Sequence, residues 1–99
     1  MKLSVLGAGA WGTALAIHLS KSHPTKLWAR NSGHVSGMKK AQSNPLYLGD
    51  FKFPSLLEIT DDFDEALSGI DLIVCAVPTS GFRQILKSIN QINKSTPVI

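Results

Sequence analysis

Three glycines near the start of the chain have the spacing of a phosphate-binding turn. Gly7, Gly9 and Gly12 follow the apolar run 2–6 and lead directly into the helix-favouring run 13–17. Strand, glycine turn and helix, in this order, is the context in which Gly-x-Gly-x-x-Gly binds the pyrophosphate of a dinucleotide. We expect Gly7 to allow the sharp turn, Gly9 to let the backbone approach the phosphates, and Gly12 to let the helix pack closely. The alternative is a tight strand-to-helix connection that binds nothing.

The residues about twenty positions after the glycines indicate which dinucleotide is favoured, because an acid there binds the ribose of NAD. The sequence at 28–31 is Trp-Ala-Arg-Asn and contains no carboxylate. Arg30 could stack on the adenine or pair with a 2′-phosphate, since guanidinium suits phosphate geometry. We therefore expect NADP as a cofactor, alongside NAD. The alternative is an ordinary solvated arginine in a turn.

Two further residues are candidates for cofactor contact. Pro78 follows the apolar run 70–77, and the carboxyl ends of parallel strands form the ligand crevice of such sheets. It would lie near the nicotinamide ribose or the pyrophosphate, although a proline that simply ends the strand is equally consistent. Trp11, inside the glycine turn, could cover the pyrophosphate or pack against a further domain; the alternative is core packing.

The remaining chemistry-bearing residues do not form a metal-ligand pattern or an acid–base pair. Cys75 lies in an apolar run, which predicts a buried, reduced core residue. We expect one histidine, His34, near the adenosine end, because it follows Arg30 closely. No metal site and no catalytic residue are predicted among the histidines, which are His18, His23 and His34.

The composition and the net charge of the chain indicate which classes of partner it suits. The 99 residues are 43% hydrophobic and 17% charged, enough for a core, and the net charge is +3. The basic residues are scattered, so nucleic-acid binding is a weak alternative, whereas an anionic substrate suits this charge. The apolar stretch from Lys2 to Leu19 is interrupted by glycines and is shorter than the roughly 20 residues of a membrane span. We expect a cytoplasmic protein without stable membrane insertion.

The elements that must position these residues alternate between strand and helix. This alternation predicts an α/β fold, a doubly wound parallel sheet of the Rossmann type with helices on both faces. The sheet is expected to be partial, with about five strands, because the chain stops where a strand begins; residues 1–99 would be an incomplete N-terminal NAD(P)-binding domain. The segment 43–57 is expected to be irregular. The expected strands are 2–6, 26–29, 57–60, 70–77 and one that begins near Val98. The expected helices are 10–22, one capped by Asn31 or Ser32 and running to Ala41, a short one that starts at 61–62 and ends before Gly69, and one capped by Thr79 or Ser80 and running to Ile92.

Four segments together resemble the bacterial NAD(P)-dependent glycerol-3-phosphate dehydrogenase family. They are Gly-Ala-Gly-Ala-Trp-Gly-Thr-Ala-Leu-Ala at 7–16, Leu-Trp-Ala-Arg at 27–30, Asn-Pro-Leu-Tyr-Leu at 44–48 and Ala-Val-Pro-Thr at 76–79. The resemblance implies NAD(P)H-dependent reduction of dihydroxyacetone phosphate to sn-glycerol 3-phosphate for phospholipid synthesis. It also implies cofactor contacts from Ala10, Trp11 and Arg30, and it allows a homodimer of the full-length protein.

The same resemblance places the catalytic lysines and the helical substrate domain beyond residue 99, so the chain alone is expected to be inactive. One departure is the sequence 47–50, Tyr-Leu-Gly-Asp, where the family usually has Tyr-Leu-Pro-Gly. Two alternatives stay open. One is another β-hydroxyacid or ketopantoate-type reductase, and the other is a non-catalytic nucleotide-sensing module on the same fold.

Overall fold

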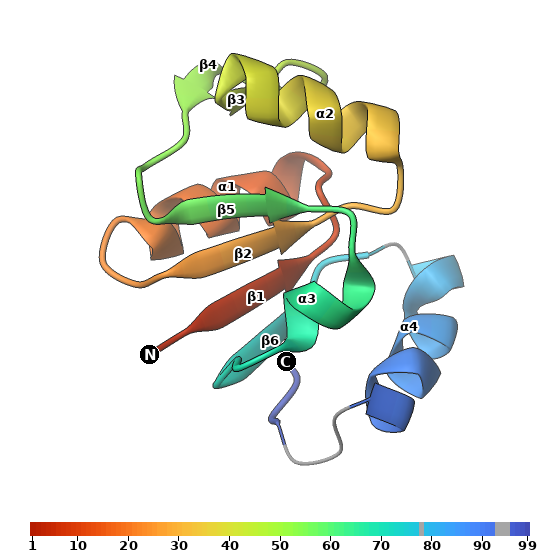
Figure 1. The fold of residues 1–99 in the computed structure, drawn as a ribbon. Coiled ribbons are helices and arrows are strands. Elements are labelled where there is room, and N and C mark those ends of the chain that lie inside the picture. The colour runs from red at the N-terminus through yellow and green to blue at the C-terminus, as the bar shows by residue number, and fades with distance from the viewer. Residues whose placement is uncertain (78, 93–95) are drawn as a thin grey trace.

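A four-stranded parallel sheet forms the centre of the computed structural model, with helices on both faces (Figure 1). The structure describes residues 1–77, 79–92 and 96–99. In chain order the elements are β1 (Leu3–Leu6), α1 (Ala10–Ser20), β2 (Thr25–Trp28), α2 (Ser32–Ala41), β3 (Ser43–Asn44), β4 (Leu48–Lys52), β5 (Leu57–Thr60), α3 (Phe63–Leu67), β6 (Leu72–Cys75) and α4 (Thr79–Ile92).

The strand order β5-β2-β1-β6 confirms the predicted doubly wound sheet. From β1 the chain winds outward through β2 to β5 and then returns to the other side of β1 with β6. This reversal of direction creates a crevice at the carboxyl ends of β1 and β6, where ligands bind in open α/β sheets. A parallel bridge between Ile73 and Val98 extends the sheet beyond β6, at the place where the sequence predicts a further strand.

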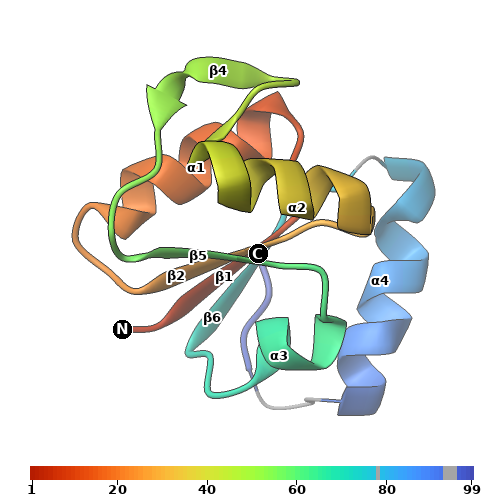
Figure 2. The same cartoon turned by 45° about the horizontal axis from the view of Figure 1, so that its top comes forward.

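Two apolar cores lie on opposite faces of the sheet, because successive strand residues point to opposite sides. Val5 contributes to the core under α1 and α2, and its neighbour Leu6 contributes to the core under α3 and α4. Figure 2 shows the two pairs of helices on either side of the sheet. None of the helices in the described ranges is both long and apolar enough to cross a membrane.

The expectation of an irregular segment at 43–57 is wrong in part, because β3 and β4 form an antiparallel pair there. Gln42 follows α2 as its C-cap, adopts a left-handed conformation (φ 54°) and turns the chain back. The backbone N–H of Phe53 donates to the carbonyl oxygen of Gln42 at 2.8 Å and closes the pair. The strand expected at 70–77 is also shorter, since β6 covers only Leu72–Cys75.

Candidate functional site

The turn between β1 and α1 has the backbone geometry that its glycines predict. Gly7 has φ +115°, a conformation that other residues rarely adopt, and its N–H donates to the carbonyl oxygen of Trp28 at 2.8 Å. A Cβ on Gly7 would lie 2.7 Å from the carbonyl oxygen of Ala76. The turn therefore fits tightly between β2 and the segment that follows β6.

The other two glycines of the motif have contrasting surroundings. A Cβ on Gly12 would overlap the carbonyl oxygen of Gly7 and lie 3.1 Å from the Cβ of Ala76, so α1 packs against the end of β1 as predicted. Around the Cβ position of Gly9, by contrast, no atom of the described residues lies within 4 Å, its two chain neighbours aside. Gly9 precedes the first turn of α1 and has no side chain to cap it. The turn thus presents open backbone at a helix start, which is the arrangement that binds phosphate.

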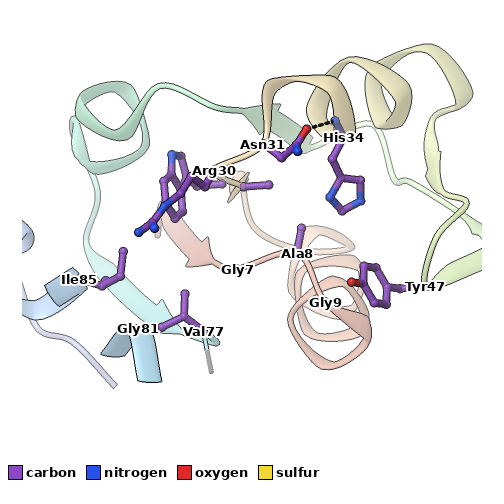
Figure 3. A pocket seen from close by; sticks show the side chains of 12 residues that line it. Gly7, Ala8, Gly9, Arg30, Asn31, His34, Tyr47, Val77, Gly81 and Ile85 are labelled. Atoms are coloured by element: carbon purple, nitrogen blue, oxygen red, sulfur yellow. Dashed lines mark hydrogen bonds between the residues drawn. The ribbon is translucent and has the colours of Figure 1, made fainter. Parts of the chain in front are cut away.

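A pocket of about 370 Å³ opens beside this turn, over the carboxyl ends of β1 and β2 (Figure 3). Its lining brings together Gly7 and Gly9 with Arg30, which is exposed, so three predicted site residues share one cavity. The complete lining is Gly7, Ala8, Gly9, Trp28, Ala29, Arg30, Asn31, His34, Tyr47, Val77, Gly81 and Ile85.

A second hollow of about 410 Å³ adjoins the same turn and is lined by Ala10, Trp11 and Gly12. The Trp11 side chain is 64% exposed, which excludes the alternative of core packing within the described residues. Ala10 is also exposed. Pro78, the last predicted site residue, lies outside the described residues; its neighbour Val77 lines both cavities.

The far end of the pocket is built by the start of α2. The side-chain oxygen of Asn31 accepts a hydrogen bond from the backbone N–H of His34 at 2.9 Å and caps the helix. Figure 3 shows Asn31 between Arg30 and His34, with the two longer side chains at either side. His34 is half-buried and lines the same pocket as Arg30.

Two residues of the β3–β4 segment belong to this site and were not identified as site residues from the sequence. Tyr47 lines both cavities, and its ring lies 5.9 Å from the His34 ring, tilted by 52°. Asn44 is completely buried, and its side-chain amide donates to the carbonyl oxygen of Ala8 at 3.0 Å, inside the glycine turn. Their motif, Asn-Pro-Leu-Tyr-Leu, is part of the family resemblance and is the one sequence signal that points to them.

Cys75 is half-buried against the core under α3 and α4, so the prediction of a buried core residue is wrong in degree. The cysteine is free, and burial raises the pKa of the Cys75 thiol, more than a hydrogen bond with the Val77 backbone lowers it. A raised pKa keeps the thiol protonated and unreactive near neutral pH. Within the described ranges, no group of three or more His, Cys, Asp or Glu side chains could hold a metal ion.

Comparisons with known proteins agree with this architecture. Two relatives named glycerol-3-phosphate dehydrogenase [NAD(P)+] match the whole chain, one from Methylobacillus flagellatus at 50% identity and one from Thiobacillus denitrificans at 44%. The chain spans 30% of the length of each. The crystal structure of glycerol-3-phosphate dehydrogenase from Coxiella burnetii superimposes with a TM-score of 0.93 at 32% identity. The superposition includes 98% of this chain and 30% of the Coxiella burnetii chain.

The sequence profile described as the N-terminus of NAD-dependent glycerol-3-phosphate dehydrogenase matches residues 2–99. This is nearly the whole chain, and it includes the glycine turn, Arg30 and the β3–β4 segment. The chain therefore belongs to the family of NAD-dependent glycerol-3-phosphate dehydrogenase N-terminal domains.

Proposed function

We propose that the full-length protein carrying this chain catalyses the reversible NAD(P)H-dependent reduction of dihydroxyacetone phosphate to sn-glycerol 3-phosphate, in the cytoplasm, for glycerophospholipid synthesis. Residues 1–99 contribute the dinucleotide-binding part, and the catalytic lysines come from beyond residue 99. Family membership and the names of the relatives support this proposal. The family match also favours it over a ketopantoate-type reductase.

The observation that carries the proposal is the contrast among the three glycines. The positions of Gly7 and Gly12 are filled by neighbouring protein atoms, whereas the position beside Gly9 is open. The first pair therefore shapes the turn, and Gly9 leaves room for a ligand that must come close to the backbone. A pyrophosphate fits this opening, because unpaired N–H groups and the positive end of the helix dipole favour negative charge.

The rest of the pocket suits the remainder of a dinucleotide. Arg30 and His34 line its far end, where we place the adenosine, and Arg30 would pair with the 2′-phosphate of NADP. Val77 lies at the opposite wall, after β6, where we place the nicotinamide side together with Pro78. Trp11 and Ala10 flank the pyrophosphate from the second hollow.

When bound, NAD(P)H supplies the hydride that reduces a carbonyl carbon. The part played by this chain is to bind and orient the dinucleotide at the crevice between β1 and β6. Fixing the reacting groups in this way lowers the entropic barrier of the transfer. Polarisation of the substrate carbonyl is assigned to a lysine beyond residue 99.

The test is to follow NADPH oxidation by the purified full-length protein with dihydroxyacetone phosphate, and separately to titrate NADPH and NADH binding. Turnover with this substrate supports the proposal. Tight NADPH binding without turnover of it would instead favour a nucleotide-sensing module. Turnover of a 2-keto acid in preference to dihydroxyacetone phosphate would favour the other reductase class.

A further inference from the structure

We propose that Asn44 is a positioning residue of the dinucleotide site, holding both the glycine turn and His34 in the geometry that receives the cofactor. This inference rests on the proposed function and assigns a role to a residue that lies outside the glycine motif. It follows from the hydrogen bonds of a single buried amide.

The amide nitrogen of Asn44 donates hydrogen bonds to two acceptors. It donates to the carbonyl oxygen of Ala8 at 3.0 Å and to Thr13 Oγ1 at 2.8 Å. Ala8 lies between the two glycines that form the turn, and Thr13 lies in the first half of α1. Because Asn44 is completely buried, no water competes for these bonds.

The turn itself is anchored at each of its three positions. The N–H of Gly7 donates to Trp28, the carbonyl of Ala8 accepts from Asn44, and the carbonyl of Gly9 accepts from the N–H of Thr13 at 3.0 Å. The Asn44 bond is the one supplied by a side chain. It points the Ala8 carbonyl toward the β3–β4 segment and so fixes the peptide plane that leads into Gly9, where phosphate would lie.

The amide oxygen of Asn44 determines which ring nitrogen of His34 carries the hydrogen. It lies 2.9 Å from His34 Nε2. The opposite orientation of the amide would place its oxygen against the Ala8 carbonyl oxygen, so the oxygen must face the histidine. Since an amide oxygen only accepts, His34 Nε2 must carry the hydrogen, and a neutral His34 has Nδ1 unprotonated. Asn44 thus fixes both the tautomer and the ring position of a residue lining the adenosine end.

The first experiment tests this tautomer without any cofactor. Nitrogen-15 NMR of the full-length protein, at a pH where histidine is neutral, should show His34 protonated at Nε2 and not at Nδ1. The signal is assigned by its loss in His34→Gln. An Nδ1-protonated His34, or an equal mixture of the two tautomers, would overturn the proposal even if the protein binds NADPH well.

The second experiment separates positioning from stability. Asn44→Asp keeps an acceptor for His34 but sets a carboxylate oxygen against the Ala8 carbonyl, and Asn44→Ala removes all three bonds. The matched control is Ser20→Ala. It removes the hydrogen bond of another buried residue, from Ser20 Oγ to the Ile17 carbonyl at 3.1 Å, at the far end of α1. Dissociation constants for NADPH are measured at a temperature where circular dichroism shows each variant folded.

Each Asn44 variant that folds should bind NADPH at least about tenfold more weakly than wild type, because a buried polar group has lost its partner. Ser20→Ala should lose stability but keep wild-type NADPH affinity. Wild-type affinity in a folded Asn44 variant overturns the role of Asn44 and leaves the proposed function intact. A wild-type protein that binds neither NADPH nor NADH refutes the proposed function instead, while the histidine tautomer still reports on the hydrogen bond.

Discussion

Gly12, in the first turn of α1, packs so closely on the end of β1 that a Cβ added to it would overlap the carbonyl oxygen of Gly7. This contact joins the first and last glycines of the motif. It sets the distance between strand and helix and leaves the intervening turn open on its outer side at Gly9.

Gly12→Ala should destabilise the protein, because the added methyl group meets backbone atoms that cannot rotate away. Overpacking of this kind costs about 1–3 kcal/mol in the free energy of unfolding. Urea denaturation monitored by circular dichroism measures the loss. Gly37→Ala is the matched control, since Gly37 lies inside α2 with open space around its Cβ position, and it should not be destabilised.

Gly9→Ala, unlike Gly12→Ala, should change the stability of the protein little and should weaken NADPH binding. Apart from its two chain neighbours, no described residue has an atom within 4 Å of the new methyl group, so the expected change in stability is small, about 0.5 kcal/mol for a less favourable helix cap. NADPH binding should weaken strongly, because the methyl group occupies the space proposed for the pyrophosphate. Titration of NADPH together with a denaturation curve separates the two effects. Unchanged affinity would show that the phosphates do not lie against Gly9.

Arg30→Ala should distinguish the two cofactors. A charge-assisted contact with the 2′-phosphate predicts about a tenfold loss of NADPH affinity with little change for NADH. Arg30→Lys should recover part of the loss, since lysine keeps the charge without the planar fork. Arg83→Ala, an exposed arginine on α4, serves as the control. Equal losses for NADPH and NADH would assign Arg30 to the adenine or ribose instead.

Cys75 should make stability fall at alkaline pH. Its thiol pKa is raised in the folded protein by burial, so above the pKa of the unfolded thiol the unfolded chain releases a proton that the folded chain retains. The resulting loss grows as pH rises from the unfolded pKa to the folded one. Denaturation curves of wild type and Cys75→Ala over this range measure the difference. Parallel pH dependences would contradict the raised pKa.

The thiol of Cys75 should also be slow to react. Because the thiolate is the nucleophile, a raised pKa predicts slower alkylation at neutral pH in the folded protein than in urea. A folded-state rate as fast as the unfolded one would contradict this. The free cysteine is therefore expected to act as a packing residue rather than a reactive one.

The sequence by itself determined the glycine turn, the strand–helix alternation and the parallel sheet. These follow from short-range physics: glycine alone readily tolerates the φ of Gly7, and continuous apolar runs specify strands that are covered by helices on both faces. The helix caps at Asn31 and Asp62 also rest on local chemistry, since each side chain accepts a hydrogen bond from the backbone N–H three residues later.

Only the tertiary structure decided the β3–β4 pair, the position of Tyr47 and the burial of Asn44. The partners of the Asn44 side chain at Ala8 and Thr13 are 36 and 31 residues away in the chain, so no local pattern contains these bonds. An asparagine before a proline reads locally as a turn residue on the surface. In the fold, Asn44 lies in the interior. It can be buried there because its amide forms hydrogen bonds with three partners: the Ala8 carbonyl, Thr13 on α1 and His34 on α2.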